Sequence, residues 1–166
     1  MSINWDAIGA VGEIVGAIAV VASLAYLAIQ IRNQNSEAKA ATLQQVLESN
    51  AAAISQLQDP ELADIWLKGI DDFRSLSDVH RLRFVIYLAS TMRSFENAFF
   101  QMKANRLDDE TWNTLSSVVR DVASTAGFQE FMKIRKHHFR PEFVEYLENL
   151  EEGDYSYVRA SNEDDI

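Results

Sequence analysis

Residues 7–29 read AIGAVGEIVGAIAVVASLAYLAI, an apolar run in which Glu13 is the only charged residue. As an α-helix, a run of this length spans about 34 Å, which is enough to cross a hydrocarbon layer of about 30 Å. We therefore predict a transmembrane helix over residues 7–31, preceded by a short outer leader over residues 1–6. The buried core helix of a soluble bundle is the alternative. A cleaved signal peptide fits less well, because the leader MSINWD carries no Lys or Arg.

The charges beside this helix predict its orientation. Arg32 and Lys39 follow it, whereas Asp6 precedes it and no cation does. Because cations favour the cytoplasmic side of a membrane, we expect the N-terminus outside and most of the chain in the cytoplasm. The expected location is a bacterial inner membrane, crossed once. Trp5 and Tyr26 are expected near the two headgroup layers.

Small residues form a stripe along the predicted membrane helix, with successive members three and four positions apart: Gly9, Gly12, Gly16, Ala19 and Ser23. Such a stripe lets two helix backbones approach closely in lipid, where apolar burial does not drive association. It predicts self-association or contact with another membrane protein. The alternative is chance, since 11 of the 23 residues in the run are Gly, Ala or Ser.

Glu13 lies next to this stripe in the sequence and is a candidate ion or proton site. An ionisable side chain inside a membrane is costly and faces water, a pore or a partner. In a homo-oligomer, a ring of Glu13 carboxylates would line a path for cations. Alternatively, the hydrocarbon layer begins at Ile14, and Glu13 lies among the lipid headgroups.

The remainder, residues 32–152, predicts a small bundle of helices. No stretch alternates between apolar and polar residues in the manner of a strand. The first helix is expected to continue to about Leu57, because neither Pro nor Gly interrupts it. Asp59 is the expected N-cap of the next helix, with Pro60 at its first position.

The clearest helical period lies between residues 78 and 106, after a cap at Ser75 or Ser77. Apolar side chains recur there at steps of three and four: Val85, Leu88, Met92, Phe95, Phe99 and Met102. A further helix is expected after Asp108 or Asp109, ended by Gly127 in the C′ position. Two more are expected over residues 128–138 and from Pro141. Arg93 and Glu96, one turn apart, predict a partly buried pair that fixes helix register.

Charge is spread unevenly over the 166 residues, whose 15 basic and 25 acidic side chains give a net charge of -10. This balance argues against nucleic acid as a partner. Residues 133–140 (KIRKHHFR) carry four cations, which are candidates for contact with anionic lipid headgroups: Lys133, Arg135, Lys136 and Arg140. Alternatively, they neutralise the acidic final helix. The acidic tail, residues 153–166, is expected to dock, if at all, only through Tyr155, Tyr157 and Val158.

Few patterns of catalytic chemistry occur in the chain. The absence of cysteine excludes thiolate metal sites and a cysteine nucleophile. The adjacent His137 and His138 would project about 100° apart on a helix, so we expect no metal site there, and we expect no cofactor. We do not expect an enzyme. The spacing of Arg74 and His80 is similar to the Arg-x4–6-His spacing of the all-α HEPN ribonucleases, which is kept as an alternative.

The segment ending in Gln30, Ile31, Arg32 and Asn33 resembles a group of uncharacterised bacterial proteins with one apolar helix, a Q-I-R-x-N-like signature and a small helical domain. Residues 93–112 are similar to the same group. The resemblance implies this architecture and assigns no activity. The expected protein is all-α, with a transmembrane helix continuing into a cytoplasmic bundle, and acts as an oligomeric interaction or accessory subunit. A small homo-oligomeric ion channel with Glu13 near the pore mouth is the first alternative.

Overall fold

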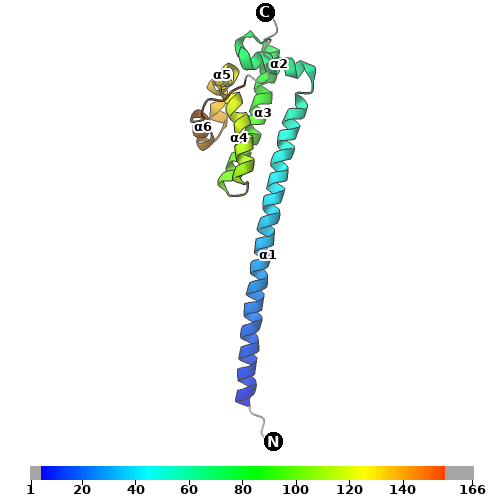
Figure 1. Cartoon of the computed structure of the whole chain (residues 1–166), viewed down its shortest axis with the longest axis vertical. Coiled ribbons are helices and arrows are strands. Elements are labelled where there is room, and N and C mark those ends of the chain that lie inside the picture. Colours follow the sequence, from blue (N-terminus) through cyan, green and yellow to red (C-terminus); the bar gives the residue numbers. More distant parts are fainter. Residues whose placement is uncertain (1–4, 156–166) are drawn as a thin grey trace, which may run out of the picture. The chain divides into compact units, whose positions relative to one another are not determined.

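In the computed structural model, residues 5–155 are described, and every regular element among them is a helix. The chain divides into two compact units, residues 1–41 and residues 42–166. Helix α1 (Trp5–Gln56) begins in the first unit and ends in the second (Figure 1). The expected continuation of the first helix to about Leu57 is therefore confirmed.

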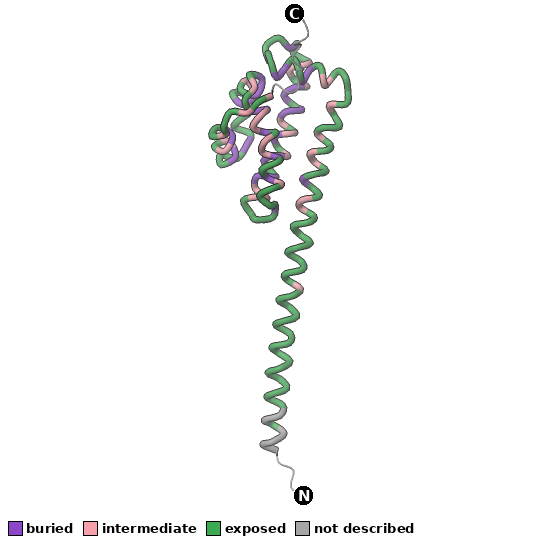
Figure 2. Tube along the Cα trace, in the orientation of Figure 1, coloured by how far each residue is buried: buried purple, intermediate pink, exposed green. Residues whose placement is uncertain are grey.

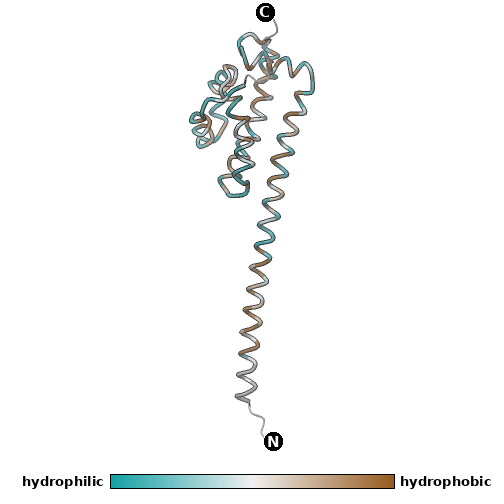
Figure 3. The backbone as a smooth tube through the Cα atoms, viewed as in Figure 1, coloured by the Kyte–Doolittle hydropathy of each residue, from teal (hydrophilic) through white to brown (hydrophobic). Residues whose placement is uncertain are grey.

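In the first unit, the described side chains of α1 are almost all exposed, and Figure 2 shows a mostly green tube above the grey end, with one intermediate residue, Gln30. Its apolar residues gather in the half nearer the N-terminus (Figure 3). Among the described helices, α1 alone is long and apolar enough to cross a membrane.

The second unit begins with the last turns of α1 and contains five more α-helices and two short 3₁₀ helices among its described residues. Their bounds are α2 (Pro60–Asp71), η1 (Phe73–Ser75), α3 (Asp78–Lys103), α4 (Asp109–Ala123), α5 (Ala126–Arg135), η2 (Lys136–His138) and α6 (Pro141–Glu148). The expected bundle of helices is confirmed within this part. The third helix is one turn shorter than expected, and the fifth ends in a 3₁₀ turn.

Side-chain caps explain where several of these helices begin. The carboxylate of Asp59 accepts the backbone N–H of Leu62 at 2.8 Å, and Pro60 follows at the first helical position. Ser77 caps α3 through the N–H of His80, and Asp108 caps α4 through the N–H of Thr111. Each cap satisfies an N–H that a helix start otherwise leaves without a partner. The predicted cap at Asp59 is confirmed, and Ser77 rather than Ser75 caps α3.

The core of the second unit forms around α3. Of the six apolar residues predicted from its period, five are buried and Met102 is partly buried. Toward the start of α3, the ring of Trp66 stacks on Phe84 and meets Tyr87 edge-on. Toward its end, Phe99 contacts Trp112, Phe143 and Tyr146, with ring centroids 4.9–5.8 Å apart. These aromatic contacts join α3 to α2, α4 and α6.

Gly127 does not end a helix, which corrects the sequence-based expectation. Helix α4 ends at Ala123, Thr125 caps α5, and Gly127 is a buried residue of α5. A Cβ atom on Gly127 would lie 2.0 Å from the carbonyl oxygen of Gly69 in α2. Glycine is needed here because the two helix backbones touch, a requirement that the local sequence does not reveal.

Candidate functional site

The predicted association stripe lies on the exposed part of α1. A Cβ atom built on Gly9, Gly12 or Gly16 would meet nothing within 4 Å. At about 100° per residue, the five stripe residues fall within an arc of about 80°. The Ser23 hydroxyl donates to the carbonyl of Ala19 at 2.8 Å, so it is satisfied within its own helix. The stripe is therefore a narrow track of small side chains with room for another backbone.

Large apolar side chains surround the stripe. Eight of them are exposed by 54–66% of their surface: Ile14, Val15, Ile18, Val20, Val21, Leu24, Leu27 and Ile29. At about 100° per residue they cover all of the helix circumference except an arc of about 120°, which holds the stripe, unlike the single apolar face of a helix at the surface of a soluble domain. Contiguous exposed apolar surface of this kind is typical of sites that contact lipid, a ligand or another protein. Glu13 lies about 60° from Gly16 around the helix and is exposed.

A tyrosine and a glutamine contact each other at the C-terminal end of the apolar run. The Gln30 side-chain amide donates to the Tyr26 hydroxyl at 2.8 Å. Tyrosine is enriched where a helix leaves the hydrocarbon layer, because its ring is apolar and its hydroxyl is polar. The side chain of Trp5, the expected partner at the opposite end, lies outside the described residues.

The four cations of residues 133–140 do not form one unpaired basic surface. Lys133 pairs with Glu130 at 2.8 Å, and Lys136 pairs with Glu148 of α6 at 3.4 Å. The Lys133 ammonium, with Arg74 nearby, lowers the pKa of the Glu130 carboxyl below its usual value. Two of the four candidates for lipid contact are thus paired with acidic side chains, and the contact of Lys136 with α6 fits the alternative that the segment neutralises the final helix.

Arg93 and Glu96 form a clamp on the segment before α6. Glu96 is the one buried charged residue of the described chain, 4% exposed, and its carboxylate binds the Arg93 guanidinium. Its other oxygen accepts the backbone N–H of Arg140 at 2.7 Å. Arg93 also donates to the carbonyl of His138 at 2.8 Å. The predicted pair is confirmed, but it holds two distant segments together, a role that the spacing on α3 could not reveal.

A polar cleft of about 450 Å³ opens beside this clamp. Its lining comes from α1, α3 and the residue before α6: Gln45, Ser49, Arg93, Ser94, Glu96, Asn97, Phe100 and Arg140. The hydroxyl of Ser49 donates to that of Ser94 at 2.7 Å and joins the two helices. Of these residues, the sequence singled out only Arg93, Glu96 and Arg140. The others carry no local signal, because the cleft depends on the packing of α1 against α3.

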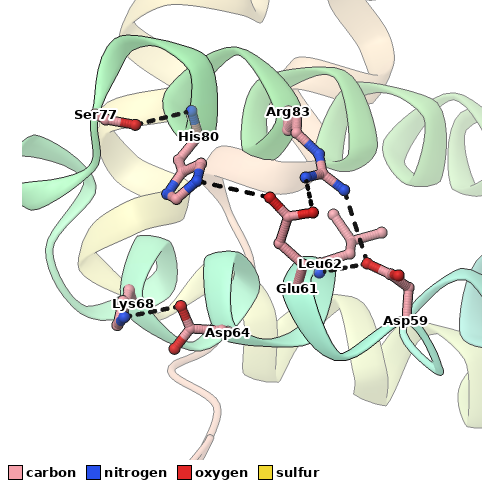
Figure 4. A network of polar contacts seen from close by, with 8 residues as sticks. All are labelled: Asp59, Glu61, Leu62, Asp64, Lys68, Ser77, His80 and Arg83. Carbon is pink, nitrogen blue, oxygen red and sulfur yellow. Dashed lines mark hydrogen bonds and ion pairs between the residues drawn. The ribbon is translucent and has the colours of Figure 1, made fainter.

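His80 and Arg74 do not meet in the structure. The imidazole Nε2 of His80 lies 3.8 Å from Glu61, whereas the Arg74 guanidinium lies 3.4 Å from Glu130. Figure 4 shows that Glu61 also contacts Arg83, at 2.7 Å, and that Arg83 approaches Asp59 at 3.7 Å. These are ion pairs between α2 and α3 near the molecular surface, and such exposed pairs contribute little to stability.

The histidine pair 137–138 lies in η2, where the two ring centroids are 4.3 Å apart. Desolvation and the nearby His137, Arg135 and Arg93 lower the pKa of His138 below its usual value. Within residues 5–155, no group of three or more His, Cys, Asp or Glu side chains is placed to hold a metal ion.

The tail begins with docked residues. The Trp66 indole donates to the Tyr155 hydroxyl at 2.7 Å, and the backbone N–H of Asp154 donates to Asp121 at 3.2 Å. The predicted contact through Tyr155 is confirmed, whereas Tyr157 and Val158 lie outside the described residues. Compared with models of known protein families, with curated proteins and with solved structures, the chain matches none.

Proposed function

We propose that this chain is a single-pass membrane protein that acts as an oligomeric interaction or accessory subunit. The observation that supports the proposal is the exposed apolar surface of α1 between Ile14 and Ile29, in a helix long and apolar enough to cross a membrane. Lipid satisfies such a surface on all sides. Within lipid, the track at Gly12 and Gly16 is where a second helix could approach most closely.

The orientation follows from the charges beside the helix. Arg32 and Lys39 lie between the apolar run and the helical domain in the sequence, which supports a cytoplasmic domain and an outer N-terminus in a membrane of bacterial inner-membrane type. The domain offers a partner a compact surface of helices. The buried core, the caps and the clamp at Glu96 are those of a stable structural unit, which suits an accessory role.

The mass of the particle in a mild detergent tests the association. We expect the full-length chain to form an oligomer by light scattering, and Gly12→Leu with Gly16→Leu to reduce it to a monomer. The matched control places Leu at Ala25 and Ala28, which lie on the opposite side of α1. An unchanged mass in the stripe variant, or a wild-type monomer, would remove the stripe from the proposal.

Ion flux distinguishes this role from that of a channel. An accessory subunit reconstituted in vesicles conducts no ions. Flux that falls on Glu13→Gln would instead assign the carboxylate to a pore and overturn the accessory role.

A further inference from the structure

We propose that the cleft between α1, α3 and Arg140 binds a phosphate ester. The inference concerns the helical domain alone and does not depend on α1 crossing a membrane. It begins from Arg140, which sequence analysis grouped with three other cations and which the structure separates from them.

Arg140 is positioned to meet an anion. Its guanidinium lies 4.4 Å from the ring centroid of Phe100, a contact that holds the planar group at the wall of the cleft. Among residues 5–155, no carboxylate pairs with it. By contrast, Lys133 and Lys136 each have an acidic partner. An exposed guanidinium that stacks on an aromatic ring and has no carboxylate partner is suited to bidentate binding of an oxyanion.

The negative charge in the cleft is already compensated. Glu96 is buried, and its two oxygens are occupied by the Arg93 guanidinium and by the backbone N–H of Arg140. Arg93, Arg140 and Glu96 together leave one net positive charge. That value matches the single negative charge of a phosphate diester and partly neutralises a monoester.

Neutral donors complete the lining. The amides of Gln45 and Asn97 line the cleft, and amide N–H groups are common partners of phosphate oxygens. The hydroxyls of Ser49 and Ser94 also line it, but their protons are donated within the protein, from Ser49 to Ser94 and from Ser94 to the carbonyl of Ser90. A volume of about 450 Å³ is far larger than a bare ion requires and leaves room for the alcohol part of an ester. The chemistry therefore fits a phosphate group on a polar carrier, supplied either by a lipid headgroup or by a soluble metabolite.

Thermal unfolding of the full-length chain in a neutral detergent tests the site. The probes are inorganic phosphate, glycerol 3-phosphate and dihexanoyl phosphatidic acid, with glycerol and dihexanoylglycerol, which carry no phosphate, as controls. A ligand that binds only the folded state raises the unfolding midpoint as its concentration increases. We expect the phosphate esters to raise it at millimolar concentrations. A larger effect of the lipid indicates a headgroup, and an equal or larger effect of glycerol 3-phosphate indicates a soluble ester.

Three variants make the test specific. Arg140→Gln should weaken the apparent affinity at least tenfold, a factor expected for a lost bidentate contact. Arg106→Gln makes the same change in charge outside the cleft and should leave the affinity unchanged. Should Arg140→Gln fold poorly, Asn97→Asp serves instead, because Asn97 is exposed and the added charge repels an anion. Equal affinity in the wild type and the cleft variants, or no response to any phosphate ester, would overturn the proposal.

Discussion

The two units of this chain treat apolar side chains in opposite ways. In the first, Ile18 and Leu24 are 64% and 60% exposed, and large apolar side chains lie on most of the circumference of α1 outside the stripe. In the second, Phe84 and Leu88 are fully buried among helices of the same chain. Burial of apolar surface is favourable, and the second unit achieves it within its own helices, whereas under our proposal lipid or a partner helix covers the first. Stability and assembly should therefore respond to mutations in different halves of the molecule.

The largest expected difference is between Phe84→Ala and Ile18→Ala. Phe84 contacts Trp66 and Phe73, so its removal should lower the free energy of unfolding of the domain by about 3–5 kcal/mol. Ile18→Ala should leave that free energy unchanged. Chemical denaturation of the full chain in detergent, followed by tryptophan fluorescence, measures both. Equal losses would show that the two units unfold as one.

The next comparison is between two glycines. Gly127→Ala should destabilise the domain by about 1–3 kcal/mol or more, because the new Cβ atom would collide with the backbone of Gly69. Gly16→Ala has open space around it and should change the unfolding of the domain little. The same denaturation curves test the pair. A neutral Gly127→Ala would mean that α2 and α5 separate easily.

A change in the clamp formed by Arg93 and Glu96 should have a smaller effect on the free energy of unfolding. Glu96→Gln keeps an acceptor for the Arg140 N–H but removes the charge that Arg93 binds, and we expect a loss of about 1–3 kcal/mol. Glu145→Gln, an exposed change of the same kind, is the control and should fall within experimental error. If Glu96→Gln lowers the free energy of unfolding no more than the control does, the ion pair is as weak as an exposed one.

The smallest expected effect depends on pH. Because the pKa of His138 is lowered in the folded state, the unfolded chain binds a proton more readily as the pH falls below about 6.5. The contribution of His138 to stability is therefore present above this pH and lost below it. His138→Gln should make stability less dependent on pH in this range, as measured by unfolding midpoints from pH 5 to 8. An unchanged profile in the variant would contradict the cause assigned here.

Local signals in the sequence were enough to predict much of this architecture. The apolar run of α1, the cap at Asp59, the proline at residue 60 and the period of α3 each act within one or two turns of helix. Such features depend only on residues that are close together in the sequence. They place the helices without showing how the helices meet.

Contacts between distant residues account for what could not be predicted. The sequence around Gly127 is typical of a helix end, yet Gly127 lies against the backbone of Gly69 in another helix. The carboxylate of Glu96 accepts a backbone N–H from a residue 44 positions away. Nothing in the sequence around Ser49 or Ser94 predicts their contact, which depends on the packing of α1 against α3 and joins the two hydroxyl oxygens at 2.7 Å. The candidate phosphate site also depends on contacts between distant residues. Of its lining, the sequence pointed only to the two arginines and Glu96.

Flotation of the full-length chain with neutral phosphatidylcholine vesicles, in alkaline carbonate and without detergent, tests the central claim most directly. Carbonate releases proteins that are held only at the membrane surface, whereas an inserted helix stays in the hydrocarbon layer. We predict that the chain rises with the vesicles and that Val20→Arg with Val21→Asp reduces this fraction, because charges at the centre of a membrane helix are costly. A chain that remains in the aqueous layer as a soluble monomer would contradict the account.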